Sequence, residues 1–269
     1  MIKIENTEVY GWKAAVRGMR NPMNSWSKSD SQYDVTGFWD EQMTLPAETT
    51  PFIAGDDDLK LMKNLVNAGS DHGKFMRMIT VTCDIIAPLY WWKEYDTYKV
   101  GTVANSCSTM HKIHAKEFTM DDFSHEHLTC ETDGLWVNAD GRDFMCSALD
   151  FCQITCDVLN HYRELYLETK DKKYWWQMIQ LLPSSYNQTR NVMMNYEVLC
   201  NIYKSRKSHR LDEWVKFCKW IEELPYSELI CGDEVIDKVA DKFCEIGNIN
   251  PLSKEEIEQS VNLSRVKED

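Results

Sequence analysis

The stretch APLYWWKEYDTYKVGTVANSCSTM, residues 87–110, combines paired tryptophans with tyrosines, lysines and short hydroxyl side chains. Aromatic rings can stack on a planar ligand, and ammonium groups can bind the phosphate that such a ligand carries. The same composition is typical of a helix that packs two tryptophans into the core, and residue chemistry alone favours this second interpretation. The alternating run before it, Phe75–Ile86, predicts a strand.

The sequence on either side of this stretch predicts an α+β fold that is mostly helical and has a small central sheet. A strand is expected at Ile2–Tyr10 and a short helix at Trp12–Arg20. Apolar spacing predicts further helices over Asp56–Gly69, Phe144–Glu168, Lys172–Leu182, Arg190–Arg206, Arg210–Leu224, Asp233–Ile246 and Lys254–Leu263. The aromatic-rich segment Asn24–Thr50 is interpreted as an ordered surface excursion, and residues 115–141 as irregular and acidic.

We expect one domain over residues 1–269. Its parts are an N-terminal strand and surface excursion (1–55), a helix, strand and signature stretch (56–110), a helical part (142–224) and C-terminal helices (225–269).

Composition limits the classes of function. The net charge of −13 argues against nucleic-acid binding, which relies on a basic face, but it leaves room for a small phosphorylated ligand. No apolar run reaches the length of a membrane span and no signal peptide is recognisable, so a cytoplasmic protein is expected. The ten cysteines include no CxxC pair and are interpreted as free thiols.

Three groups of residues leave alternatives open. His111, His114 and the HEHLTC run at 125–130 have ligand types suited to zinc, although a solvated acidic loop is the favoured interpretation. Cys107, among polar residues, is either a nucleophile or a small filler. The cations between Arg190 and Arg210 frame one predicted helix, and Arg190 at its start could donate to a phosphate.

Taken in order, these pieces resemble the flavin-dependent thymidylate synthase family over most of Glu8–Leu224. The likeness lies in AAVRGMR at 14–20, the helix over residues 58–69 followed by HGKF at 72–75, and the pair Ala87-Pro88. A degenerate form of the family's central signature falls on Thr97-Tyr98-Lys99, Thr102, Asn105, Cys107 and Thr109-Met110. The run with the most specific spacing is Leu181-Leu182-Pro183, Asn195, Arg206, His209 and Glu213.

The resemblance implies a homotetramer whose sites are shared between subunits. In the family, reduced flavin, charged by NADPH, takes a one-carbon unit from methylenetetrahydrofolate and completes its transfer to carbon 5 of dUMP. By matching position, the implied FAD contacts are Lys74, Tyr98, Lys99, Asn105, Arg206 and His209. The implied nucleotide contacts are Glu94, Thr97, Cys107, Thr109 and Arg190, of which Glu94 and Cys107 are also the catalytic candidates.

Departures from the family pattern carry physical consequences. Thr97 and Thr109 stand where the family has arginines, so two bidentate phosphate donors are lost, each worth about 1.5–3 kcal/mol. Glu94 replaces a glutamine, and an acceptor suits the amino group of cytosine, so dCMP or a modified pyrimidine is an alternative substrate. The thiol of Cys107 could attack carbon 6 of the ring. We interpret the chain as a divergent, virus-borne relative, with a catalytically inactive nucleotide-binding protein as the other alternative.

Overall fold

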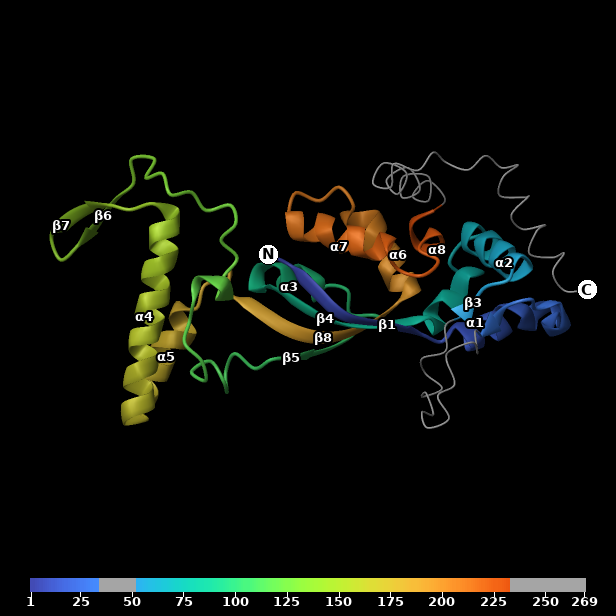
Figure 1. Cartoon of the computed structure of the whole chain (residues 1–269), viewed down its shortest axis with the longest axis horizontal. Helices are drawn as coiled ribbons and strands as arrows, with labels where there is room; N and C mark the ends of the chain where they lie inside the picture. Colours follow the sequence, from blue (N-terminus) through green and yellow to red (C-terminus); the bar gives the residue numbers. More distant parts are fainter. Residues whose placement is uncertain (34–51, 233–269) are drawn as a thin grey trace, which may run out of the picture.

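The computed structural model describes residues 1–33 and 52–232, and its centre is a four-stranded antiparallel sheet (Figure 1). The strand order is β1–β4–β8–β5, with bounds Lys3–Tyr10, Thr80–Pro88, Asn187–Asn195 and Val103–Ser106 respectively. Helices make up most of the remaining regular structure. The prediction of a mostly helical α+β fold with a small central sheet is confirmed.

The helices fall into three groups around the sheet (Figure 1). Covering one face are α3 (Leu89–Tyr95), α6 (Tyr196–Arg206), α7 (Asp212–Glu222) and α8 (Glu228–Cys231). At one end of the sheet lie α1 (Trp12–Arg20), α2 (Asp56–Asn67) and the short pair β2 (Gln32–Tyr33) and β3 (Phe52–Ile53). At the other end lie α4 (Ala148–Thr169), α5 (Lys172–Leu181) and the hairpin β6 (Trp136–Ala139) with β7 (Arg142–Met145). Short 3₁₀ turns are η1 (Asn21–Met23), η2 (Trp26–Lys28), η3 (Gly73–Met78) and η4 (Met120–Asp122).

Strand alternation decides which face of the sheet the helices cover. Along β4, Val81, Cys83 and Ile85 are completely buried, while the residues between them are half-buried. Side chains alternate in a strand, so the second face carries the polar residues. On that face Glu5, Asp84, Asn191 and Asn105 lie in register across all four strands.

The tryptophan pair of α3 belongs to the core. Trp91 and Trp92 are 0% and 1% exposed, and the Trp91 ring lies 4.7 Å from that of Trp214 in α7. The interpretation of this stretch as a helix that packs two tryptophans into the core is therefore confirmed. The alternative, in which a planar ligand stacks on these two rings, is wrong because no ring face is accessible.

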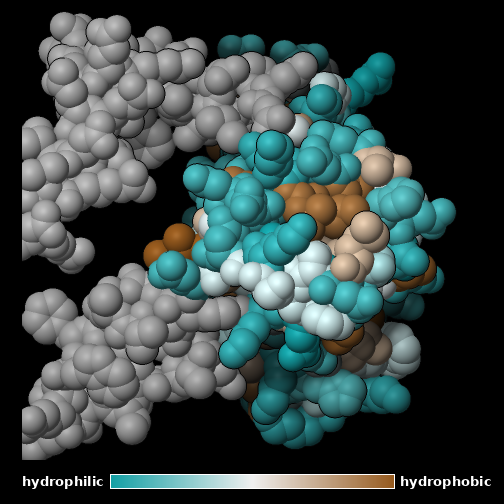
Figure 2. Space-filling model, turned by 90° about the vertical axis from the view of Figure 1, so that its right-hand side faces the viewer, coloured by the Kyte–Doolittle hydropathy of each residue, from teal (hydrophilic) through white to brown (hydrophobic). Residues whose placement is uncertain are grey.

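The end of the molecule at α1 and α2 presents a mostly hydrophilic surface (Figure 2). Helix α2 carries three aspartates in its first turn, where they complement the helix dipole. One of them, Asp58, is completely buried and forms an ion pair with Arg20 of α1, with the Nε and Oδ1 atoms 2.6 Å apart. This pair joins the two helices below a polar surface.

Residues 111–186 form a second packing unit, which we call the helical arm. Its core consists of Ile113, Phe118, Phe123, Cys152, Cys156, Leu159 and Met178. The two cysteines pack as apolar residues, as their place in the stripe of α4 predicts. Helix α4 begins at Ala148, where Ser147 and Asp150 form a capping box, and the predicted start at Phe144 is wrong because residues 142–145 pair with β6.

Two other boundaries differ from the prediction. The helix expected over Arg190–Arg206 is wrong in its first part, because residues 190–195 belong to β8, which lies between β4 and β5. The strand expected from Phe75 begins at Thr80, since residues 73–78 form η3. The helices expected after residue 232 and most of the excursion at 24–50 lie outside the described residues, and the single-domain organisation stays a prediction. No helix among residues 1–33 and 52–232 is both long and apolar enough to cross a membrane.

Candidate functional site

The strongest polar cluster joins the end of α3 to the junction between α6 and α7. Nη1 of Arg206 lies 2.6 Å from Oε2 of Glu94, and its Nε donates to the hydroxyl of Tyr98 at 2.9 Å. The indole of Trp214 donates to the same Glu94 oxygen at 3.0 Å, and the guanidinium lies 4.7 Å from the centre of a Trp214 ring. We call Glu94, Tyr98, Arg206, His209 and Trp214 the Arg206 cluster.

His209 completes this cluster from the α6–α7 turn. The backbone N–H of Leu211 donates to Nδ1 of His209 at 3.2 Å. Nε2 lies 3.5 Å from Oε2 of Glu94 and 3.0 Å from Nη1 of Arg206. Three predicted flavin contacts, Tyr98, Arg206 and His209, are thus brought together with Glu94.

Tyr98 also lines a cavity of about 360 Å³, which we call the Tyr98 cavity. Its lining consists of Tyr95, Asp96, Tyr98, Lys99, Thr102 and Ala104. The hydroxyl of Tyr95 is buried without a hydrogen-bond partner among the described residues, and burial raises its pKa well above the usual range. The aromatic ring of Tyr98 and the ammonium group of Lys99 suit a ligand that has both rings and phosphates.

Arg190 lies in the middle of β8 rather than at a helix start. Its guanidinium lies 4.2 Å from the centre of a Trp92 ring, and its Nη1 pairs with Asp96 at 2.7 Å. Its Nε donates to Gln188 at 2.9 Å, and Gln188 in turn donates to the carbonyl of Cys107 at 2.9 Å. These bonds connect the Tyr98 cavity with the segment that carries Cys107.

Cys107 lines a cavity of about 680 Å³, which we call the Cys107 cavity. Its polar lining includes Ser108, Thr109, Lys112, Lys116, Thr119, Asp121, Asp122, Asn187, Gln188 and Thr189. The Cys107 side chain is exposed, and Thr109 is half-buried beside it. Both cavity volumes fall in the range of about 300–1,000 Å³ that is typical of small-molecule sites.

Three predicted site residues stay outside this constellation in the single chain. Lys74 lies in η3, before the start of β4, whereas Glu94 lies beyond the end of that strand, which is about 30 Å long. Asn105 lies opposite Asn191 on the face of the sheet away from Trp92. Thr97 is exposed, and its hydroxyl donates to the backbone carbonyl of Glu94 at 2.7 Å.

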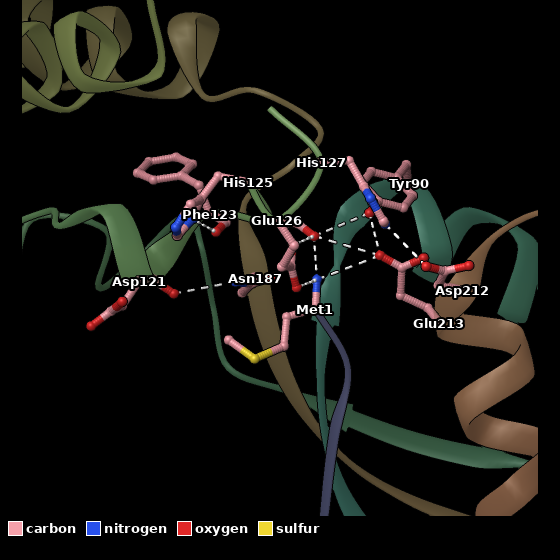
Figure 3. Close-up of polar contacts among 11 residues, drawn as sticks. Met1, Tyr90, Asp121, Phe123, His125, Glu126, His127, Asn187, Asp212 and Glu213 are labelled. Carbon is pink, nitrogen blue, oxygen red and sulfur yellow. Dashed lines mark hydrogen bonds and ion pairs between the residues drawn. The ribbon is translucent and has the colours of Figure 1, made fainter. Parts of the chain in front are cut away.

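A separate polar cluster lies where the arm meets the core (Figure 3). The Met1 ammonium pairs with Glu126 at 2.5 Å and with Glu213 of α7 at 3.4 Å, and the Tyr90 hydroxyl donates to Glu213. Burial raises the pKa of Glu126, but hydrogen bonds from the Met1 ammonium, from its own backbone N–H and from the Ser124 hydroxyl together outweigh burial and lower the pKa to about 2. Contacts across this cluster fix the arm against α3 and α7.

Two of the candidate zinc ligands, His125 and His127, have separate partners in the same region (Figure 3). Nδ1 of His125 contacts the carbonyl of Phe123 at 2.8 Å, and Nε2 of His127 pairs with Asp212 at 3.1 Å. In the described part of the chain, no group of three or more His, Cys, Asp or Glu side chains is arranged to hold a metal ion. The alternative of a zinc site at these residues therefore has no support in the described part of the chain.

Sequence reasoning missed three residues that hold the site together: Trp214, Asp96 and Gln188. The spacing around Trp214 predicts only a core position of an amphipathic helix. Nothing in the sequence indicates that its indole donates to Glu94. Asp96 and Gln188 act through Arg190, whose strand position places it opposite α3. Gln188, Arg190, Val192 and Met194 occupy every second position and share one face of β8. This period of two is the sequence signal from which the strand could have been predicted.

No protein-family model and no curated protein sequence matches the chain. Among solved structures, the chain is similar to thymidylate synthase X from Helicobacter pylori with FAD and dUMP, with 14% identity, a TM-score of 0.57, and coverage of 88% of this chain and 99% of that one. A second structure of the flavin-dependent enzyme ThyX from Helicobacter pylori, also complexed with FAD and dUMP, gives 14% identity, a TM-score of 0.55, and coverage of 86% and 99%. At this identity the likeness shows the fold, and the resemblance that the sequence predicted is confirmed at the level of the fold.

Proposed function

We propose that this chain is a flavin-dependent enzyme that transfers a one-carbon unit from methylenetetrahydrofolate to carbon 5 of a deoxypyrimidine monophosphate, with dUMP as the default substrate. The observation that carries the proposal is the convergence of Glu94, Tyr98, Arg206 and His209 in one cluster. These residues were chosen by their matching positions, and they meet in a chain that has the fold of ThyX.

The Tyr98 cavity is the proposed flavin site. Tyr98 would face the ring system, Lys99 would meet a phosphate, and Arg206 with His209 would hold Tyr98 and Glu94 in place. Bound FAD would supply the reducing electrons, which NADPH would restore. The volume of this cavity lies near the lower limit for ligand sites, so additional residues are needed to enclose an extended dinucleotide.

A site shared between subunits of a homotetramer would supply those residues. Lys74 and Asn105 lie far from the Arg206 cluster in the same chain, and a neighbouring chain could bring its own copies to the site. The proposal therefore retains the shared-site assembly that the family resemblance implies.

The Cys107 cavity is the proposed nucleotide site. Cys107 and Thr109 line it, and Arg190 is connected to it through Gln188, whereas Thr97 lies outside it. Addition of the Cys107 thiolate to carbon 6 would move ring electrons toward carbon 5, which then bonds to the one-carbon unit. Loss of the carbon 5 proton would release tetrahydrofolate and leave a methylene group on carbon 5. A hydride supplied by reduced flavin would convert this methylene to the methyl group as the sulfur leaves carbon 6, which restores the ring.

Cytosine is the alternative base, and the exposure and the unused carboxylate oxygen of Glu94 favour it. Its side chain is 35% exposed, and the described bonds all use Oε2, which leaves Oε1 as an acceptor for an amino group. The amino group of cytosine would donate to this acceptor, which the carbonyl of uracil cannot do. Because Glu94 does not line the Cys107 cavity, this alternative places the base beside the Arg206 cluster instead.

The deciding test is the visible absorbance of purified protein, before and after addition of FAD, with dUMP and dCMP titrated in. We expect a flavin band that shifts with one nucleotide, and that nucleotide identifies the base. Arg206→Ala should lose the band, whereas Lys204→Ala on the exposed side of α6 should keep it. A wild-type protein that ignores FAD but binds the nucleotide would instead be a non-catalytic nucleotide-binding protein.

A further inference from the structure

The Cys107 cavity contains two cations to which neither the residue matching nor the proposed chemistry assigns a role. Lys112 and Lys116 both line it, and the segment between Cys107 and Lys112 also contributes Ser108 and Thr109. Two hydroxyls and an ammonium group from the short segment 108–112 therefore contribute to the wall of the cavity. Such a wall offers hydrogen-bond donors and positive charge together, which are the requirements of a phosphate group.

The two lysines differ in how far they are already neutralised. Lys116 forms an ion pair with Asp122, whose other carboxylate oxygen accepts from the backbone N–H of Thr119 at 2.9 Å. Lys112 is exposed and forms no ion pair with an acid within residues 1–33 and 52–232. Its charge is therefore available to a ligand, whereas that of Lys116 is largely compensated.

The acidic residues of the cavity come from a different segment of the chain. Asp121 and Asp122 come from η4, and the Asp121 carbonyl accepts from Asn187 of β8 at 3.2 Å (Figure 3). A phosphate dianion would be repelled from these carboxylates and attracted to the unpaired ammonium of Lys112. The charge distribution thus orients an anionic ligand with its phosphate at Lys112.

We propose that Lys112 is the phosphate-binding cation of a pyrimidine nucleoside monophosphate in the Cys107 cavity, with Ser108 and Thr109 as hydroxyl donors. The inference rests on the proposed function, which places the nucleotide in this cavity. It explains how the site retains charge although threonines stand at positions 97 and 109: the cation comes three residues after Thr109 instead. The base then lies at the other end of the ligand, on the side of Cys107 and Gln188.

The test compares a nucleotide with its nucleoside. Calorimetric titrations of the full chain with dUMP and with deoxyuridine separate contacts to phosphate from contacts to base and sugar. Lys112→Ala should weaken dUMP binding by about tenfold, leave deoxyuridine binding unchanged, and reduce the dependence of dUMP binding on salt. Lys112→Arg should restore most of the dUMP affinity, and Lys219→Ala, at an exposed position on α7, should match the wild type in every titration.

The outcomes distinguish this inference from the proposed function. If the wild type binds dUMP and Lys112→Ala binds it equally well, the role of Lys112 is wrong and the enzyme proposal stands. Equal losses for dUMP and deoxyuridine would also overturn the role, because Lys112 would then act on the cavity as a whole. A wild type that binds no pyrimidine nucleotide, with or without flavin, would overturn both proposals.

Discussion

The carboxylate of Glu94 and the guanidinium of Arg206 form an ion pair 2.6 Å apart, and this pair joins the end of α3 to the end of α6. The two residues are 112 positions apart in the chain. Trp214 of α7 donates to the same carboxylate, so three helices meet at one oxygen. The same atoms therefore belong to the proposed ligand site and to the contact that holds α3, α6 and α7 together.

Replacement of Arg206 should affect stability as well as ligand binding. Arg206→Ala removes a charged hydrogen bond from Glu94 and another from Tyr98, so we expect a loss of about 2 kcal/mol in the free energy of unfolding. Urea denaturation monitored by tryptophan fluorescence measures this change. Lys204→Ala, an exposed residue on the same helix, should change it by less than about 0.5 kcal/mol. Equal urea midpoints for Arg206→Ala and Lys204→Ala would contradict the role of the Glu94–Arg206 pair in holding the helices together.

Asp58 should make stability fall at low pH. Burial alone would raise its pKa, but hydrogen bonds from Ser31, Ser29 and Arg20 outweigh burial and lower it. Because the folded pKa lies below the unfolded value of about 3.9, the contribution is present above about pH 4 and is lost as the pH falls through the folded pKa.

Asp58→Asn should therefore lose about 3 kcal/mol at neutral pH and show a flatter stability profile below about pH 4. Thermal unfolding measured across pH for the wild type and the variant tests this. Asp56→Asn, an exposed position in the same helical turn, provides the control. Parallel pH profiles of wild type and Asp58→Asn would show that the buried pair does not act in this way.

The Trp91 ring should be a determinant of stability rather than a ligand contact. Trp91 is completely buried, so Trp91→Ala should cost about 4 kcal/mol through lost burial and a cavity. Replacement of Trp136, which is 62% exposed, by alanine should lower the free energy of unfolding by less than about 1 kcal/mol. Chemical denaturation of both variants gives the comparison, and a small effect at Trp91 would contradict the core assignment.

Cys107 should behave as the accessible and functional thiol. Burial raises the pKa of Cys83 and of Cys218 to about 12, so these thiols should react slowly, whereas Cys107 and Cys130 are exposed. We expect bound nucleotide to protect Cys107, but not Cys130, from a thiol-labelling reagent. Mass spectrometry of the labelled peptides identifies each site.

Cys107→Ser should lower turnover by a hundredfold or more, on the order expected when a nucleophile is lost, and should keep the flavin spectrum. Cys130→Ser should retain full activity. Full activity in the Cys107→Ser protein would rule out attack of this thiol on carbon 6 and leave the nucleotide site itself intact.

Much of the architecture follows from local sequence. Apolar spacing and end signals correctly predicted α1, α2, α5 and α7, and the buried cysteine stripe of α4, because helical periodicity depends on residues three or four positions apart. The positions of Arg206, His209 and Glu94 were also predictable, since each lies at or near the end of a predicted helix. Even the missed β6–β7 hairpin had a local signal: Asp140-Gly141, with φ values of 51° and 73°, suits a tight turn.

Tertiary structure alone decided how the site is assembled. Arg190 belongs to a strand and not to a helix because β4 and β5 pair with it from about 100 and about 85 positions away, and such pairing leaves no local trace. The same pairing directs Arg190 toward Trp92 and Asp96, and it brings the carbonyl of Cys107 to Gln188. The sequence by itself determined which chemical groups are present and which segments are helical. Their meeting in one site depends on strand register, which is set by burial of one face of the sheet beneath α3, α6 and α7.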